Sequence, residues 1–310
     1  MKIGEVTDYP TQIPGIENGM RVPYIYFVNS GMINTMVATV NSKNDTAMQA
    51  DIEDAITKFK AYIDPLLDEH VETGMTLDSD PYCIGVFIDN EMHVGGSNLH
   101  WDRYFKNAKA AMSAILPHKL YMCNRFATYP TDYRMAKAFK YCDVVSYNWY
   151  HNEADEETPS FPTVDGMDYV GRHQAIQDLM GGDQKDKPTI IGEFTIASFE
   201  GASVASGVRH ATTQRQRGRI VAHYLETALA SPNIIGAAFF RWADQFLTGR
   251  EVGESFQIGF VSLLDYPYYD FIDEIMEFTY SMYEADFGPA TPLQPPPPPS
   301  TPPPPTPPPT

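Results

Sequence analysis

The chain has 310 residues, with 22 Lys and Arg against 40 Asp and Glu, and therefore carries a formal net charge of −18. Nucleic acids and anionic membranes both require a basic surface, so this charge argues against both as partners. No apolar run reaches the ~18 residues of a membrane span. The opening residues 1–8 also lack the charged and then apolar arrangement of a secretory signal peptide.

Three cysteines, Cys83, Cys123 and Cys142, lie in or beside predicted strands and have no metal-ligand spacing. We therefore expect buried free thiols and no metal site. No organic cofactor is implied either.

Short apolar segments that end in polar residues alternate with amphipathic helical patterns, which predicts an α/β fold. Strands are expected at 3–6, 24–28, 83–88, 119–123, 144–147, 189–191 and 234–240. Helices are expected from Thr46, and at about 101–116, 135–141, 167–180, 211–230 and 271–283. In the first helix Thr46 to Gln49 has the form of a capping box, and Pro65 is expected to begin a further helical turn. Residues 151–165 and 195–211 are expected to form loops.

The chain divides into a barrel domain at 1–287 and a proline-rich segment at 288–310, which holds 14 of the 26 prolines. Such a segment favours extended polyproline II and predicts a disordered linker or stalk. A linker of this kind predicts that a further domain follows the proline-rich segment. A proline-rich ligand for a small recognition domain is the alternative interpretation.

Two glutamates follow apolar strands in the same way. Glu91 ends the stretch from Cys83, and Glu193 follows Ile190 and Ile191. In a parallel barrel the carboxy-terminal strand ends carry the active site. Because glycoside hydrolysis requires one carboxylic acid and one carboxylate, Glu91 and Glu193 are the candidate catalytic pair. Solvated rim residues without catalysis are the alternative.

Polar and aromatic residues at other strand ends favour the catalytic interpretation. We expect substrate contacts from Asn90, Arg125, Asn148, Tyr150, Trp242, Asp244 and Gln245. Arg125 would serve equally well as a structural ion-pair partner.

Several segments taken in order resemble the β-agarases of glycoside hydrolase family 50. They are Asp89-Asn90-Glu91, Arg125-Phe126-Ala127, 143–148, 190–194, 243–250 and 257–261. The resemblance covers roughly 24–283 and implies a TIM-type (β/α)8 barrel of the retaining clan. By the same resemblance Glu91 is the acid/base and Glu193 the nucleophile, and the substrate is a polysaccharide or oligosaccharide such as agarose or a similar neutral galactan.

Three features depart from that family pattern. Thr195 stands where a histidine is usual, and Ala238 and Phe239 stand where a His-Trp pair is expected. If 83–88 is the fourth strand, the barrel lacks its first strand and the chain is truncated at its amino terminus. Two alternatives to an agarose-cleaving enzyme therefore remain. One is a related barrel glycosidase with another β-glycoside substrate, and the other is a non-catalytic carbohydrate-binding barrel. Because a polysaccharide is too large to enter a cell readily, we expect the protein to be secreted and to act outside the cell or in the periplasm.

Overall fold

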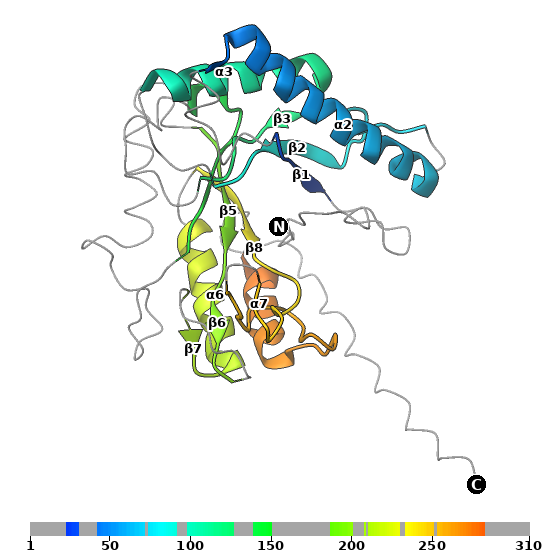
Figure 1. Ribbon diagram of the computed structural model, residues 1–310. Coiled ribbons are helices and arrows are strands. Elements are labelled where there is room, and N and C mark those ends of the chain that lie inside the picture. Colours follow the sequence, from blue (N-terminus) through cyan, green and yellow to red (C-terminus); the bar gives the residue numbers. More distant parts are fainter. Residues whose placement is uncertain are drawn as a thin grey trace.

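The computed structural model describes residues 23–30, 42–71, 74–91, 98–126, 139–150, 187–200, 208, 210–229, 233–250 and 253–282. Strands and helices alternate along these residues except from β4 to β7, between which no helix is described (Figure 1). Their bounds are β1 Tyr24–Val28, α2 Asp45–Val71, β2 Cys83–Ile88, α3 Asn98–Ile115, β3 Leu120–Tyr121, the 3-10 helix η2 Phe139–Tyr141, β4 Val145–Asn148, β5 Thr189–Phe194, β6 Ala197–Ser198, β7 His210–Ala211, α6 Gln214–Leu229, β8 Ile234–Phe239 and α7 Tyr269–Ser281. The predicted α/β class is therefore confirmed.

Two parallel sheets contain the main strands. One has the order β1-β2-β3 and the other β4-β5-β8. A parallel bridge between Phe126 and Tyr147 joins the end of β3 to β4. The six strands thus follow one another in chain order, and all of them point their carboxy-terminal ends in the same direction.

Apolar side chains cover both faces of these strands. Alternation along β1 sends Tyr24, Tyr26 and Val28 into the large core that the helices cover. Ile25 and Phe27 belong instead to a smaller cluster on the opposite face, with Phe87 and others. Burial on both faces explains why the strands read as continuous apolar runs.

The helices pack in two pairs. Figure 1 shows α2 and α3 on the same side of the first sheet, and α6 and α7 beside β5 and β8. The buried face of α2 comprises Ile52, Ile56, Ile63 and Leu67, at the spacing of a helical stripe. Trp101, Tyr104, Phe105 and Ala108 form the corresponding face of α3.

Some predicted local features were wrong. Asn44, rather than Thr46, caps α2, because its Oδ1 accepts a hydrogen bond of 2.8 Å from the amide of Ala47. Pro65 lies inside the same helix instead of beginning a new turn. The expected loop at 195–211 contributes β6 and β7, which pair in parallel. The ring of Phe199 stacks on His210 beside them at 4.0 Å.

Several predictions lie outside the described residues. These are the strand at 3–6, the acidic loop at 151–165, the helix at 167–180 and the proline-rich segment at 288–310. Of the expected helix at 135–141, only Phe139–Tyr141 is described, as a 3-10 turn. Among the helices that are described, none is both long enough and apolar enough to cross a membrane.

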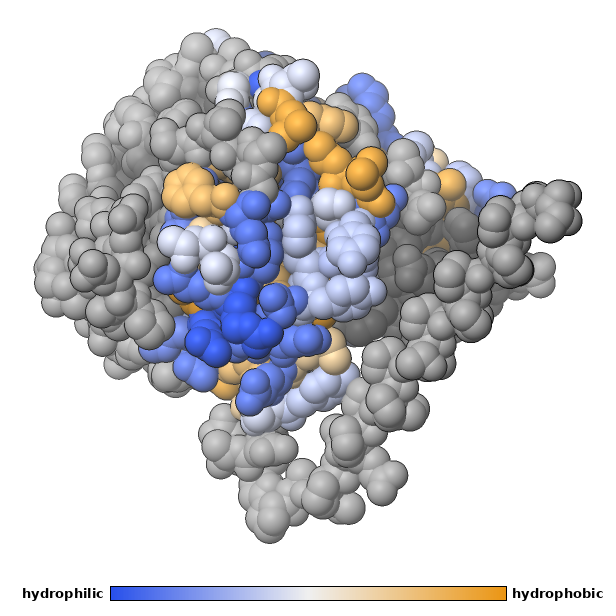
Figure 2. Space-filling view, turned by 90° about the horizontal axis from the view of Figure 1, so that it is seen from below, coloured by the Kyte–Doolittle hydropathy of each residue, from blue (hydrophilic) through white to orange (hydrophobic). Residues whose placement is uncertain are grey.

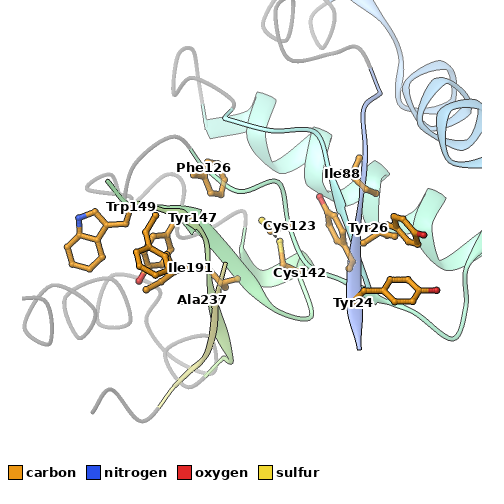
Figure 3. Close-up of a cluster of buried hydrophobic side chains, with 14 of the residues drawn as sticks. Tyr24, Tyr26, Ile88, Cys123, Phe126, Cys142, Tyr147, Trp149, Ile191 and Ala237 are labelled. Atoms are coloured by element: carbon orange, nitrogen blue, oxygen red, sulfur yellow. Dashed lines mark hydrogen bonds between the residues drawn. The ribbon is translucent and has the colours of Figure 1, made fainter. Parts of the chain in front are cut away.

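The three cysteines are free and buried, as predicted. The Sγ atoms of Cys123 and Cys142 lie 2.6 Å apart. Figure 3 shows the two side chains in the core between the two sheets. Burial raises the pKa of the Cys142 thiol well above its usual value. The thiol therefore stays protonated and packs as a small apolar group.

Arg217 in α6 joins the second sheet to the segment that follows β8. Its buried guanidinium donates to the carbonyl of Ile196 at 2.8 Å and to that of Gly259 at 2.9 Å. The ring of Phe271 in α7 lies 3.8 Å from the guanidinium carbon. Burial lowers the pKa of Arg217 to about 9, so the side chain remains charged at neutral pH.

We predict that Arg217→Ala lowers the free energy of unfolding by about 3 kcal/mol, because buried carbonyl acceptors lose their donors. Arg219→Ala in the same helix is the matched control. Arg219 is exposed and forms an ion pair of 3.3 Å with Glu274, so its loss should change stability by less than about 0.5 kcal/mol. Urea unfolding measures both. Equal effects of the two substitutions would contradict the role given to Arg217.

Candidate active site

Both candidate catalytic glutamates lie at the carboxy-terminal ends of parallel strands. Glu91 follows β2, and Glu193 lies near the end of β5. The register of β4 and β5 places Asn148 directly opposite Glu193. We call Glu91, Arg125, Asn148, Tyr150 and Glu193 the carboxylate site, because hydrogen bonds and one ion pair connect them at these strand ends.

Glu193 is buried, and its carboxyl group contacts a cation and a hydroxyl group. Nη1 of Arg125 forms an ion pair of 2.8 Å with its Oε1 atom, and the hydroxyl of Tyr150 donates to its Oε2 atom at 2.6 Å. Burial first, and then the charge of Glu193, raises the pKa of Tyr150 well above its usual value. The phenol therefore remains a donor at physiological pH. A positive charge and a donor both favour the ionised form of a carboxylate.

Arg125 is held in place from several sides. Its guanidinium lies 5.2 Å from the ring centre of Phe27 and 5.4 Å from that of Phe87, so two aromatic faces hold the cation. Its amide donates to Oγ of Ser146 at 2.9 Å. A Cβ atom at Gly192 would stand 2.7 Å from Cγ of Arg125, so glycine leaves the room that the arginine occupies.

Glu91 contacts Asn148 of β4 and the backbone of Arg125, and these two residues lie beside Glu193. The side-chain amide of Asn148 donates to Oε1 of Glu91 at 3.0 Å and lies 3.5 Å from Oδ1 of Asn90. The amide of Glu91 donates to the carbonyl of Arg125 at 3.0 Å. Glu91 has a neutral hydrogen-bond partner, whereas Glu193 has a cation, so the two carboxyl groups have different electrostatic surroundings.

The remaining predicted contact residues divide into two kinds. Trp242 is 54% exposed and stacks at 5.9 Å on the ring of Phe260, which leaves one face of the indole open. Asp244 is buried and accepts hydrogen bonds from the amide of Gly259 at 2.8 Å and the hydroxyl of Tyr268 at 2.6 Å. Gln245 accepts from the amide of Phe256 at 2.8 Å. Asp244 and Gln245 thus fasten the chain after β8, and their contact with substrate stays a prediction.

Sequence reasoning missed the residues that hold the site together. Ser146 and Gly192 determine where Arg125 lies, and Phe27 and Phe87 hold its guanidinium. Gly192 left one signal, because a glycine inside a strand indicates a close approach. No pattern in the sequence connected Phe27 or Phe87 with Arg125. Within the described residues, no group of three or more His, Cys, Asp or Glu side chains is arranged to hold a metal ion.

Known proteins resemble this chain in sequence and in structure. No family model matches it. The chain is 35% identical over 187 residues to β-agarase A of Vibrio sp. (strain JT0107), and 30% identical over 183 residues to β-agarase B of the same strain. These alignments cover 59% and 58% of this chain. The chain spans only 17% of the length of each relative.

A crystal structure of an agarase superposes with a TM-score of 0.61 at 22% identity. The superposition covers 86% of this chain and 45% of the agarase chain, and at that identity it shows a shared fold. The chain is therefore similar in sequence to these β-agarases over part of its length, and it shares the fold of the agarase that superposes on it.

Proposed function

We propose that this chain is a glycoside hydrolase that cleaves β-galactosidic bonds of agarose or a similar neutral galactan. The observation that carries the proposal is the pairing of two unlike carboxyl groups at one end of the sheet. Arg125 and Tyr150 contact Glu193, while Asn148 contacts Glu91. The β-agarases that match in sequence support the choice of substrate.

Each carboxyl group suits one step of hydrolysis. Glu193, stabilised as a carboxylate by the guanidinium of Arg125, attacks the anomeric carbon, while Glu91 protonates the departing glycosidic oxygen. Glu91 then removes a proton from water while the water oxygen attacks the anomeric carbon. The bond between that carbon and the carboxyl oxygen of Glu193 breaks, and the sugar is released. This sequence makes the enzyme retaining.

The proposed fold is a TIM-type (β/α)8 barrel. Six parallel strands in chain order, with helices on one face and the catalytic groups at their carboxy-terminal ends, support it. Because agarose is a polymer outside the cell, we propose extracellular or periplasmic action on a polysaccharide or oligosaccharide partner, without a nucleic acid, a membrane or a cofactor.

A second candidate is a related glycosidase that acts on another β-glycoside. Phe239 supports it, because this ring packs in the core against Phe194 at 5.3 Å and Phe260 at 5.1 Å. The family pattern has an aromatic platform at this position, and Phe239 is not free to serve as one. Cleavage of small aryl glycosides with agarose left intact would favour this candidate.

We predict that Glu193→Gln lowers oligosaccharide release from soluble agarose about a thousandfold or more, because the amide cannot act as the nucleophile. Glu91→Gln should lower release from agarose strongly and spare aryl galactosides that have good leaving groups. Reducing-end release and product mapping measure both. Glu226→Gln, which removes an exposed carboxylate of α6, is the matched control and should retain activity.

Agarose products that persist in Glu193→Gln would contradict the catalytic assignment. A folded wild-type chain that releases nothing from agarose or from aryl glycosides would contradict the proposed enzyme. In that case sugar binding without turnover would point to the carbohydrate-binding alternative.

A further prediction concerns the donor to Glu193. Tyr150→Phe should lower kcat about 10- to 100-fold, because a hydrogen bond to a charged group contributes about 1.5–3 kcal/mol. Loss of this donor makes protonation of Glu193 easier, so the acidic limb of the pH-rate profile should move to higher pH. Tyr280→Phe, at an exposed position in α7, is the control. An unchanged acidic limb in Tyr150→Phe would show that the phenol does not stabilise the carboxylate.

A further inference from the structure

A buried carboxylate lies two residues before Glu91. Asp89 is the first residue after β2 and is 0% exposed. In the part of the chain that the structure describes, Asp89 makes no ion pair, and the groups that donate hydrogen bonds to its carboxyl oxygens are neutral. Placing an ionisable group in the interior without a cation is costly, so the presence of Asp89 beside the site calls for a physical reason.

The partners of Asp89 come from two other elements. The amide of Ser30, just after β1, donates to its Oδ1 atom at 2.6 Å, and the hydroxyl of Ser30 donates to Oδ2. The hydroxyl of Tyr104 in α3 also donates to Oδ2, at 2.6 Å. One carboxylate thus fastens the end of β2 both to the strand beside it and to the helix that covers it.

The backbone around Asp89 is strained in the same place. Asp89 has a φ angle of 63° and Glu91 one of 49°, both in the left-handed region that side chains other than glycine disfavour. Cys123 and Arg125, on the neighbouring strand end, have φ angles of 62° and 50°. Such conformations persist only where the surrounding structure fixes them. The three hydrogen bonds to the Asp89 side chain fix the backbone at the end of β2.

This conformation determines where Glu91 lies. The amide of Asp89 donates to the carbonyl of Val28 at 2.8 Å, and the amide of Glu91 donates to that of Arg125 at 3.0 Å. The Glu91 carboxyl group then reaches Asn148 at 3.0 Å. A rotation of the backbone at Asp89 would displace Glu91 from that partner.

We propose that Asp89 is a positioning residue that, through its bonds to Ser30 and Tyr104, holds Glu91 where it can exchange a proton with the glycosidic oxygen. This inference rests on the proposed function and adds a residue to its machinery. Asp89 itself does not touch the substrate.

The test compares two galactosides in the full chain. An agarose oligosaccharide has a poor leaving group and needs the proton of Glu91, whereas a 2,4-dinitrophenyl galactoside does not. We expect Asp89→Ala to lower kcat/KM for the oligosaccharide about 100-fold and for the aryl galactoside less than about threefold, a loss typical of a displaced general acid. Azide, a nucleophile that needs no base, should raise kcat of the variant on the aryl galactoside and leave that of the wild type unchanged.

Further variants keep the test decisive. Asp89→Asn preserves size and tolerance of the left-handed conformation, so it should recover part of the lost activity. If Asp89→Ala does not fold, Tyr104→Phe and Ser30→Ala remove single donors and should shift the ratio of the two substrates in the same direction. Asp270→Asn, at an exposed site in α7, is the matched control and should leave the ratio unchanged.

Three results would overturn the inference. Equal losses on both substrates in every variant would show a merely structural role for Asp89. Wild-type activity on both substrates in every variant would show that Asp89 does not position Glu91. A folded wild-type chain that hydrolyses neither galactoside would overturn the proposed function, and this inference with it. The activity of the wild-type chain therefore shows whether only the inference about Asp89 fails or the proposed function fails with it.

Discussion

The buried ion pair between Arg125 and Glu193 is the contact on which the site depends. Its atoms lie 2.8 Å apart, and the guanidinium is held between Phe27 of β1 and Phe87 of β2. Three strands, β1, β2 and β5, and the segment after β3 therefore meet at one charged contact. Removing one partner of such a pair leaves the other charge buried and costs about 3–5 kcal/mol. The same pair connects the buried core to Glu193, the proposed nucleophile.

The site combines this rigid pair with a strained strand end. Left-handed backbone at Asp89 and Glu91 stores energy that the bonds from Ser30 and Tyr104 offset. Glu193, in contrast, is supported by a cation and a phenol. The two carboxyl groups are thus fixed by different means, and this difference in surroundings supports the proposed acid role of Glu91 and the proposed nucleophilic role of Glu193.

The sequence predicted the strands and the strand-end residues, because apolar runs that stop at polar residues are a local signal. It placed Asn148 and Glu193 at the same edge, and the register confirms their opposition. It could not predict the partners of Arg125, since Phe27 and Gly192 are brought together only by sheet order. It also could not show that Asp244 accepts a hydrogen bond from the amide of Gly259, because a local pattern shows only that a polar residue follows a strand. Whether Asp244 and Gln245 contact substrate stays a prediction.

The most direct test of the account is to trap the covalent intermediate. A 2-deoxy-2-fluoro-galactosyl fluoride slows release of the sugar from the nucleophile more than its attachment, so the labelled protein accumulates. Intact mass followed by peptide mapping should find one added fluorosugar, attached to Glu193. A label on another residue would contradict the role given to Glu193. An unlabelled protein that still cleaves a β-galactoside with inversion would contradict the retaining mechanism.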